Sequence, residues 1–192
     1  MFHLTRKEWR SLVQKIRSND TSIGSVLNLS DGCLNEHGFA HLTTALTVNT
    51  TLTTLDLETS DFFDLNAILL AEVLKANTSL KYIDLAETNV GDFGVKQLFK
   101  ALNRNTTVVS IDLREIQVGA MGAEYIATTL KVNTTLTFLE VSDNMLGDDG
   151  VSRIGEALKV NTILRTLHLG GVQMSDHGVT CIADALKVNT TL

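Results

Sequence analysis

The sequence predicts an α/β repeat protein in which one short strand alternates with one helix along the chain. The first observation behind this prediction is a 28-residue period that runs without interruption through six units, at 21–48, 49–76, 77–104, 105–132, 133–160 and 161–188. The second is that each unit has a strand-like first half and a helix-like second half. Residues 189–192 begin a further unit as a short stub.

The period shows at polar and apolar positions alike. An asparagine recurs at this step, at Asn49, Asn77, Asn105, Asn133, Asn161 and Asn189. An aliphatic residue recurs in the strand-like half, at Leu27, Leu55, Ile83, Ile111, Leu139 and Leu167. Because a single repeat cannot bury its own apolar face, we expect the units to stack and to share one core.

Residues 1–20 precede the first unit and read as a separate helix. Thr5 and Glu8 have the spacing of a capping box, and an apolar face begins at Trp9. We therefore expect an amphipathic helix in 1–20 that caps the first repeat, followed by a repeat domain over 21–192.

The fifth unit illustrates the two halves. "LTFLEVSDNML" (136–146) has apolar residues at spacings of three, two, three and two, as in a short strand that runs into a turn. "DDGVSRIGEALKV" (148–160) places Val151, Ile154 and Leu158 at helical spacing. A strand, a turn and a helix are therefore expected in every unit.

Two recurring positions mark the joints between these elements. Asn133 and its equivalents follow the helix, where we expect the left-handed conformation and a hydrogen bond to an end carbonyl. A second position holds Gly94, Gly122 and their equivalents, with Asn66 in the second unit. Because glycine and asparagine tolerate positive φ, and glycine allows close approach of a strand and a helix, this position is interpreted as backbone geometry.

The segments "LTTLDLETSDF", "LKYIDLAETNV", "LTFLEVSDNML" and "LRTLHLGGVQM" resemble leucine-rich repeats. The 28-residue length and the helix pattern G-x-x-x-(I/L)-x-x-A-L are similar to the ribonuclease-inhibitor-like class. This resemblance implies a horseshoe-shaped solenoid, with parallel strands on the concave face and helices on the convex face. The asparagine that usually follows the strand in this family survives only as Asn144, so a continuous buried ladder at that position is not expected.

Charge and composition exclude several classes of function. Residues 1–17 carry a balance of +4, whereas the other 175 residues hold 11 bases against 21 acids, or −10. Nucleic-acid binding needs a basic stripe, so a basic or mixed-charge protein is the expected partner. No apolar run has the length of a transmembrane helix, and residues 1–20 are too charged for a signal peptide. Together with only two cysteines, Cys33 and Cys181, this predicts a reduced, cytoplasmic protein without membrane attachment.

The sequence offers no evident home for catalysis. Its histidines have no spacing that resembles a metal or nucleophile motif, and Asp148 with Asp149 at a helix start is ordinary capping chemistry. The segment "GDDG" (147–150) lacks the lysine and hydroxyl residue of a phosphate-binding loop. We therefore expect no enzyme activity, no metal site and no cofactor.

Side chains that alternate with the strand leucines form the candidate binding surface. Aligned by the repeat, five columns of this face hold nine acids against Lys81, Arg114 and Arg165. Tyr82 and Phe138 supply aromatic anchors of the kind found in binding hot spots. The predicted partner-binding residues are Asp56, Glu58, Tyr82, Asp84, Glu87, Asp112, Arg114, Phe138, Glu140 and His168. The alternative is that acids between strand leucines, common in this class, only oppose aggregation.

The predicted function is a non-enzymatic protein-interaction module or scaffold, which binds a basic or amphipathic segment through the acidic concave face or its rim loops. Families with similar repeats leave three alternatives: an actin-capping domain like that of tropomodulins, a regulator of a small GTPase like the Ran GTPase-activating proteins, and the sensing repeat region of an immune-type receptor. A fourth alternative is a secreted or surface-displayed recognition protein from a processed precursor. The strand edge near Leu192 also predicts either a fragment of a longer repeat protein or self-association through that edge.

Overall fold

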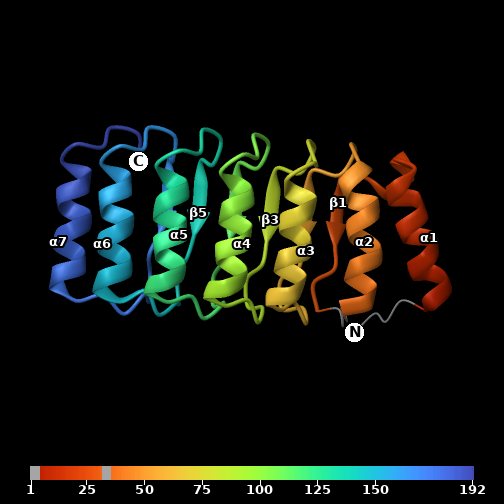
Figure 1. Cartoon of the computed structure of the whole chain (residues 1–192), viewed down its shortest axis with the longest axis horizontal. Helices are drawn as coiled ribbons and strands as arrows, with labels where there is room; N and C mark the ends of the chain where they lie inside the picture. Colours follow the sequence, from red (N-terminus) through yellow and green to blue (C-terminus); the bar gives the residue numbers. More distant parts are fainter. Residues whose placement is uncertain (1–4, 32–35) are drawn as a thin grey trace.

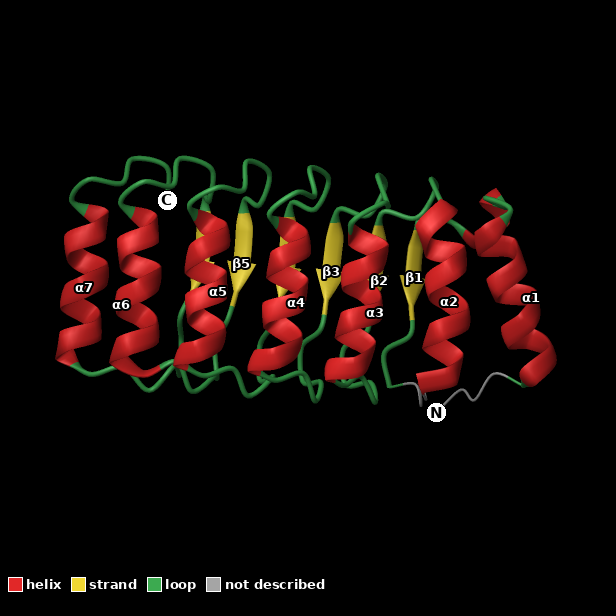
Figure 2. Cartoon of the chain, viewed as in Figure 1, coloured by secondary structure: helices red, strands yellow, loops and turns green. Residues whose placement is uncertain are grey.

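The computed structural model describes residues 5–31 and 36–192, and it has two layers. Figure 1 shows the helices side by side in one layer, in sequence order from α1 to α7, with the strands in a second layer behind them. Figure 2 shows the same alternation of helix, loop and strand along the chain. Residues 1–4 of the predicted cap, and Cys33, lie outside the described residues.

The strands form one parallel sheet in chain order. Every neighbouring pair is aligned with an offset of 28 residues, as in Leu55↔Ile83 and Ile83↔Ile111. The strands are β1 (Val26–Asn28), β2 (Thr54–Asp56), β3 (Tyr82–Asp84), β4 (Ser110–Asp112), β5 (Phe138–Glu140) and β6 (Thr166–His168).

The helices pack against one another in the same order. After α1 (Arg6–Arg17) and a short 3-10 turn, η1 (Thr21–Ile23), one helix follows each strand. These helices are α2 (Glu36–Val48), α3 (Asp64–Leu74), α4 (Asp92–Leu102), α5 (Ala120–Leu130), α6 (Gly147–Leu158) and α7 (Asp176–Leu186).

The core lies between the two layers. The middle residue of a strand, such as Leu55, Ile111 or Leu139, is fully buried, and so are helix residues such as Leu98 and Ile126. Neighbouring strands need ~4.8 Å and packed helices about 8–10 Å, so the helix layer is the wider one and the sheet lies on the concave side. The predicted leucine-rich-repeat solenoid is confirmed. The division into a cap at 1–20 and a repeat domain at 21–192 stays a prediction.

The recurring asparagine after each helix forms a buried ladder. Asn133 Nδ2 donates to the carbonyl of Leu102, the last residue of α4, at 2.7 Å. Its Oδ1 accepts from the backbone N–H groups of Thr135 and Leu136, at 2.9 and 2.7 Å. Asn77, Asn105, Asn161 and Asn189 repeat the bond to the carbonyl of a leucine in the last turn of a helix, 31 residues earlier in the chain.

The expected left-handed conformation of this asparagine is wrong. Positive φ occurs instead in the turn after each strand, at Thr59, Glu87, Glu115 and Asp143 among others. The expected bond to a helix-end carbonyl is present, although the carbonyl belongs to α4 and not to α5, the helix that Asn133 directly follows. The asparagine is therefore selected for its two-sided side chain, which satisfies a carbonyl and two amides at once.

The recurring glycine position also differs from the expected positive φ. Gly94 lies inside α4, and a Cβ atom there would stand 2.6 Å from Asp64 Oδ1 and 3.0 Å from Ala67 Cβ. Asp64 and Ala67 both belong to α3. The glycine is needed because two neighbouring helices approach closely, and not because of its own backbone conformation.

The turn after the strand is held unevenly, as the sequence predicts. Asn144 is buried and donates to the carbonyls of Leu113 and Val141, at 2.8 and 2.9 Å. At the same position Ser60 and Thr88 bond only the carbonyl three residues earlier. No continuous asparagine ladder exists at this position in the described repeats.

Aspartates at the starts of α3, α4 and α6 each tie their repeat to the next one. Asp64 Oδ1 accepts from the N–H groups of Gly91 and Gly94, and Asp92 Oδ1 accepts from those of Gly119 and Gly122. Asp148 likewise accepts from Ser175 and Gly178 at the start of α7. The predicted capping role of Asp148 is thus directed at the following helix rather than its own.

The helix α1 packs on the first repeat. The predicted capping box is present, because Glu8 N–H donates to Thr5 Oγ1 and Thr5 N–H donates to Glu8 Oε2. Trp9 packs against the core, Ile16 is fully buried, and the Ile16 carbonyl accepts from Asn49 Nδ2 at 2.7 Å. Among the described residues, no helix has the length and apolar character needed to cross a membrane.

Candidate functional site

The open face of the sheet is the face that points away from the helices. Its first row is formed by the first strand residues: Val26, Thr54, Tyr82, Ser110, Phe138 and Thr166. Its second row is formed by the third strand residues: Asn28, Asp56, Asp84, Asp112, Glu140 and His168. The strand register therefore confirms both columns of the sequence alignment.

The second row has a structural task that explains its acids. Asp84 Oδ1 accepts from the backbone N–H of Ala86 at 2.9 Å, and Asp112 Oδ1 accepts from that of Arg114 at 2.9 Å. Asn28 and Asp56 make the equivalent bond two residues ahead. A short acceptor side chain at this position closes the turn that follows the strand.

A hollow lies on the open face between Tyr82 and Phe138. Ser110, the small residue between them on β4, leaves the space that a larger side chain would fill. The hollow has a volume of about 210 Å³, and it is lined by Thr54, Asp56, Tyr82, Ile83, Asp84, Ser110, Asp112 and Phe138. It combines two aromatic walls with three carboxylates.

Arg114 lies in the row beyond these carboxylates and is paired. Its Nη2 donates to Glu58 Oε1 at 3.2 Å, which spans the repeat that lies between them. Ala86, at the equivalent position in that repeat, is small enough to let the side chain pass. The carboxylates of Asp112, Glu58, Asp84 and Glu140 raise the pKa of Arg114, so its charge is fixed.

Glu140 and His168 form a second pair, at the far end of the second row. His168 Nδ1 is hydrogen-bonded to Glu140 Oε2, and the His168 ring meets the Phe138 ring edge-on at 5.3 Å. Burial alone would raise the pKa of Glu140, but the hydrogen bonds from Ser142 and His168 outweigh it and lower the pKa. Glu140 is therefore engaged within the chain.

Asp84 and Asp112 are the carboxylates of the hollow whose negative charge is disfavoured by their surroundings. Burial raises the pKa of both carboxyls, and the neighbouring carboxylate of Asp56 raises that of Asp84 further. The turn N–H groups and Arg114 oppose the shift without cancelling it. A positive charge brought to this place would relieve the repulsion.

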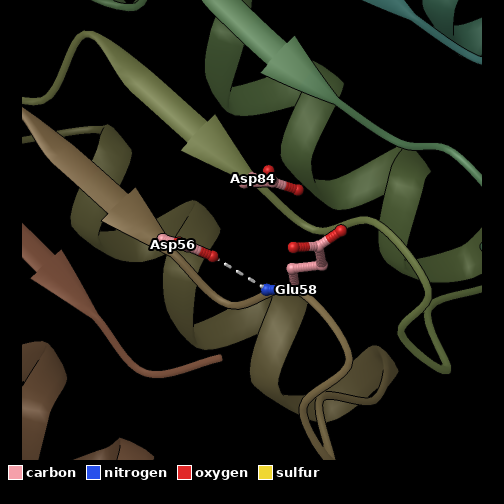
Figure 3. A group of neighbouring side chains, drawn as sticks. All are labelled: Asp56, Glu58 and Asp84. Carbon is pink, nitrogen blue, oxygen red and sulfur yellow. Dashed lines mark hydrogen bonds between the residues drawn. The ribbon is translucent and has the colours of Figure 1, made fainter. Parts of the chain in front are cut away.

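Figure 3 shows Asp56, Glu58 and Asp84 turned toward one another, with the N–H of Glu58 bonded to Asp56. One carboxylate oxygen from each lies within 4.8 Å of the others. Burial and the carboxylate of Asp84 raise the pKa of Glu58, while Arg114 lowers it. Arg114 already supplies a counter-charge, so this cluster does not indicate a metal ion.

The structure brings most of the predicted residues together. Asp56, Tyr82, Asp84, Asp112 and Phe138 line the hollow, whereas Glu58 with Arg114, and Glu140 with His168, form the two flanking pairs. Glu87 lies in the turn after β3 with positive φ and does not line the hollow.

Sequence reasoning missed Thr54 and Ser110 as lining residues. Their columns were identified, but small hydroxyl residues carry no functional signal of their own. The signal that could have found Ser110 is its place between two aromatic residues in the same column.

Comparison with known proteins agrees with this architecture. A leucine-rich-repeat family model matches residues 76–99 and 132–155. A solved structure titled as leiomodin-1 actin-binding site 2 is similar over 94% of this chain and 88% of its own, with a TM-score of 0.60 and 19% identity. The tropomodulin C-terminal domain of Caenorhabditis elegans is similar over 95% and 93%, with a TM-score of 0.58 and 14% identity.

No curated protein sequence matches the chain. At these identities the solved structures speak for the fold alone. The matched repeats, the parallel sheet in unbroken 28-residue register and the alternating helices show that the chain folds as a leucine-rich-repeat solenoid.

Proposed function

We propose that the chain is a non-enzymatic protein-interaction module that binds its partner through the open face of the sheet. The observation that carries this proposal is the hollow between Tyr82 and Phe138. Tyr82 keeps 49% of its surface exposed, although a large aromatic side chain on a stable fold gains from burial. An exposed aromatic residue beside incompletely neutralised carboxylates is typical of a surface that a partner covers.

The charge of the face defines the partner. Asp84 and Asp112 have raised pKa values because they are partly buried beside like charges. A basic or amphipathic segment would supply the missing positive charge and cover the aromatic rings. An acidic or purely apolar partner would leave the carboxylates both desolvated and unpaired, which is costly.

A catalytic role as a GTPase regulator has less support. Arg114 is the arginine that the resemblance placed on this face, and its guanidinium is held by Glu58. The carboxylates that line the hollow would repel a nucleotide phosphate, and the described lining includes no lysine or arginine to offset them. The hollow is therefore suited to binding a side chain rather than to catalysing a reaction.

Actin is the first defined partner to test, because a structure titled as an actin-binding site of leiomodin-1 shares this fold over nearly the whole chain. The likeness of fold does not transfer the binding residues. Actin therefore enters as a purified probe, beside partners captured from a native lysate.

The two tyrosines of the chain, Tyr82 on the open face and Tyr125 on α5, provide a matched crosslinking experiment. Each is replaced in turn by benzoylphenylalanine and irradiated with purified actin or with lysate. We expect one protein to be captured through position 82 and not through position 125.

Charge reversal then tests the same surface in solution. Asp84→Lys with Asp112→Lys should weaken binding of the captured protein about tenfold or more, or ~1.4 kcal/mol. The control is Glu72→Lys with Glu156→Lys, which changes the net charge equally on exposed helix positions. Equal capture through position 125, or equal weakening in both double variants, would exclude the open face as the binding surface.

A further inference from the structure

We propose that the hollow between Tyr82 and Phe138 receives the side chain of a single arginine from the partner. This inference rests on the proposed function and makes it specific, because it names the chemical group that the hollow recognises. Size, charge and an arrangement within the chain itself point to this ligand.

The spacing of the walls fits one flat group. Tyr82 and Phe138 lie on β3 and β5, with Ser110 of β4 between them, so their backbones are two strand spacings or ~9.6 Å apart. Non-bonded carbon atoms pack at about 3.5–4.0 Å, so two rings at this separation leave room for one side chain between them. The small Ser110 keeps the floor open.

Two of the carboxylates beside the aromatic rings each have one oxygen atom available to accept a hydrogen bond from a ligand. The turn uses Oδ1 of Asp84 and of Asp112, and no hydrogen bond from the described residues reaches their Oδ2 atoms. Asp56 differs, because its Oδ1 accepts from Glu58 and its Oδ2 accepts from Asn28. Asp84 and Asp112 are therefore the pair that can accept from an incoming donor.

The chain shows how such a donor is held. Arg114 extends over the small Ala86, bonds Glu58 and lies close enough to Asp84 and Asp112 to feel both charges. This arrangement serves the row beyond the acids. On the other side of the same acids, the described residues that line the hollow include no lysine or arginine, so a partner would supply the corresponding cation.

Arginine fits this environment better than lysine. Its guanidinium is planar, stacks on aromatic faces and donates in a fork that matches two neighbouring carboxylates. A lysine ammonium is a compact, strongly hydrated charge that gains less from two flanking rings. The hollow therefore discriminates by shape as well as by charge.

A titration followed by two-dimensional amide NMR of the whole chain tests the inference with defined probes. N-acetyl-argininamide should shift the amide signals of β3, β4 and β5, with a dissociation constant in the millimolar range. N-acetyl-lysinamide should bind about threefold or more weakly, and N-acetyl-citrullinamide, which keeps the shape without the charge, should leave these signals unchanged.

Matched variants locate the site. Ser110→Phe fills the hollow and should abolish the shifts, whereas Thr166→Phe adds the same ring to the same row on β6 and should retain them. Asp84→Asn with Asp112→Asn keeps the Oδ1 acceptors of the turns and should also abolish the shifts. The spectra of the free variants show directly whether each one is folded.

Binding of the citrulline probe to the same residues, or binding that survives in Ser110→Phe, would overturn the inference. The proposed function is tested separately by crosslinking through position 82. A captured partner without binding of the arginine probe would leave the interaction module in place and remove only the arginine.

Discussion

Asp84 and Asp112 show how one side chain serves both the fold and the surface. Each closes the turn after its strand with one carboxylate oxygen and presents the other to the open face. A neutral amide can also close this turn, as Asn28 does in the first repeat. The negative charge is therefore an addition to the structural task, and the fold is stabilised less because of it.

The pH dependence of stability tests this cost. Burial raises the folded-state pKa of Asp84 and Asp112 above the ordinary value of 3.8, so the folded chain holds these protons more tightly than the unfolded chain. The stabilisation that this gives is complete below pH ~3.8 and is lost as the pH rises through the folded-state pKa values. Asp84→Asn with Asp112→Asn should accordingly raise Tm by a few degrees at pH 7, and the gain should shrink as the pH falls toward 3.8.

Asp148→Asn is the control of opposite sign. Hydrogen bonds from Ser175 lower the pKa of Asp148, so its carboxylate favours the folded state and the variant should lower Tm at pH 7. Thermal unfolding followed by circular dichroism between pH 3 and pH 8 measures both variants. If the double variant is less stable than the native chain at pH 7, then the charges of Asp84 and Asp112 do not destabilise the fold.

At the scale of elements, the joint between a helix and the next strand depends on the asparagine ladder. Asn133 is 6% exposed and joins the end of α4 to the segment that leads into β5. Asn133→Ala would leave a carbonyl and two amides without this partner, so we expect a loss of roughly 2–4 kcal/mol and a fall in Tm of about 5–10 °C.

The exposed Asn103, which ends α4, is the matched control. Asn103→Ala should change stability by no more than about 0.5 kcal/mol. Chemical denaturation of both variants measures the difference, and similar losses in the two would show that the ladder does not hold the joint.

The sequence predicts these elements better than it predicts their joints. The 28-residue step and the two kinds of periodicity place every strand, every repeat helix and both rows of the open face. Gly94 was misread because its reason, Asp64 on the neighbouring helix, lies 30 residues away and leaves no local pattern. Positive φ at Thr59 and Glu87 could not be predicted, because threonine and glutamate rarely adopt it and so give no signal in the sequence.

For the candidate site, the sequence identifies which side chains share a face but not how they pair. The bond between Arg114 and Glu58 spans 56 residues and depends on the small Ala86 between them. The hollow likewise depends on the small side chain of Ser110. Its position between Tyr82 and Phe138 follows only from the register of three strands.

The whole molecule behaves as a row of neighbours, because each repeat contacts mainly the repeats on either side. The first repeat is covered by α1, where Ile16 is fully buried and supplies a carbonyl to Asn49. Damage at one place should therefore spread only as far as the adjacent repeats.

Ile16→Ala tests this behaviour. The cavity should cost about 2–4 kcal/mol, and amide hydrogen exchange should accelerate in α1 and α2 while α5 and α6 stay protected. The control is Ile126→Ala, an equally buried position in α5, which should accelerate exchange in α4, α5 and α6 instead. Uniform acceleration across the chain in Ile16→Ala would show that the solenoid unfolds as one unit.

The asparagine ladder also bears on covalent modification. Asn49, Asn77, Asn105, Asn133 and Asn189 each have serine or threonine two positions later, which is the acceptor triplet for N-linked glycosylation. In the folded chain the serine or threonine two positions later has another role, because its hydroxyl donates to the asparagine side chain, as from Thr135 Oγ1 to Asn133 Oδ1. The amide nitrogen that a sugar would occupy donates to a helix-end carbonyl two units earlier, as in Asn133 to Leu102. A glycan on Asn133 could be attached only before the repeats close, and it would then keep the joint from forming.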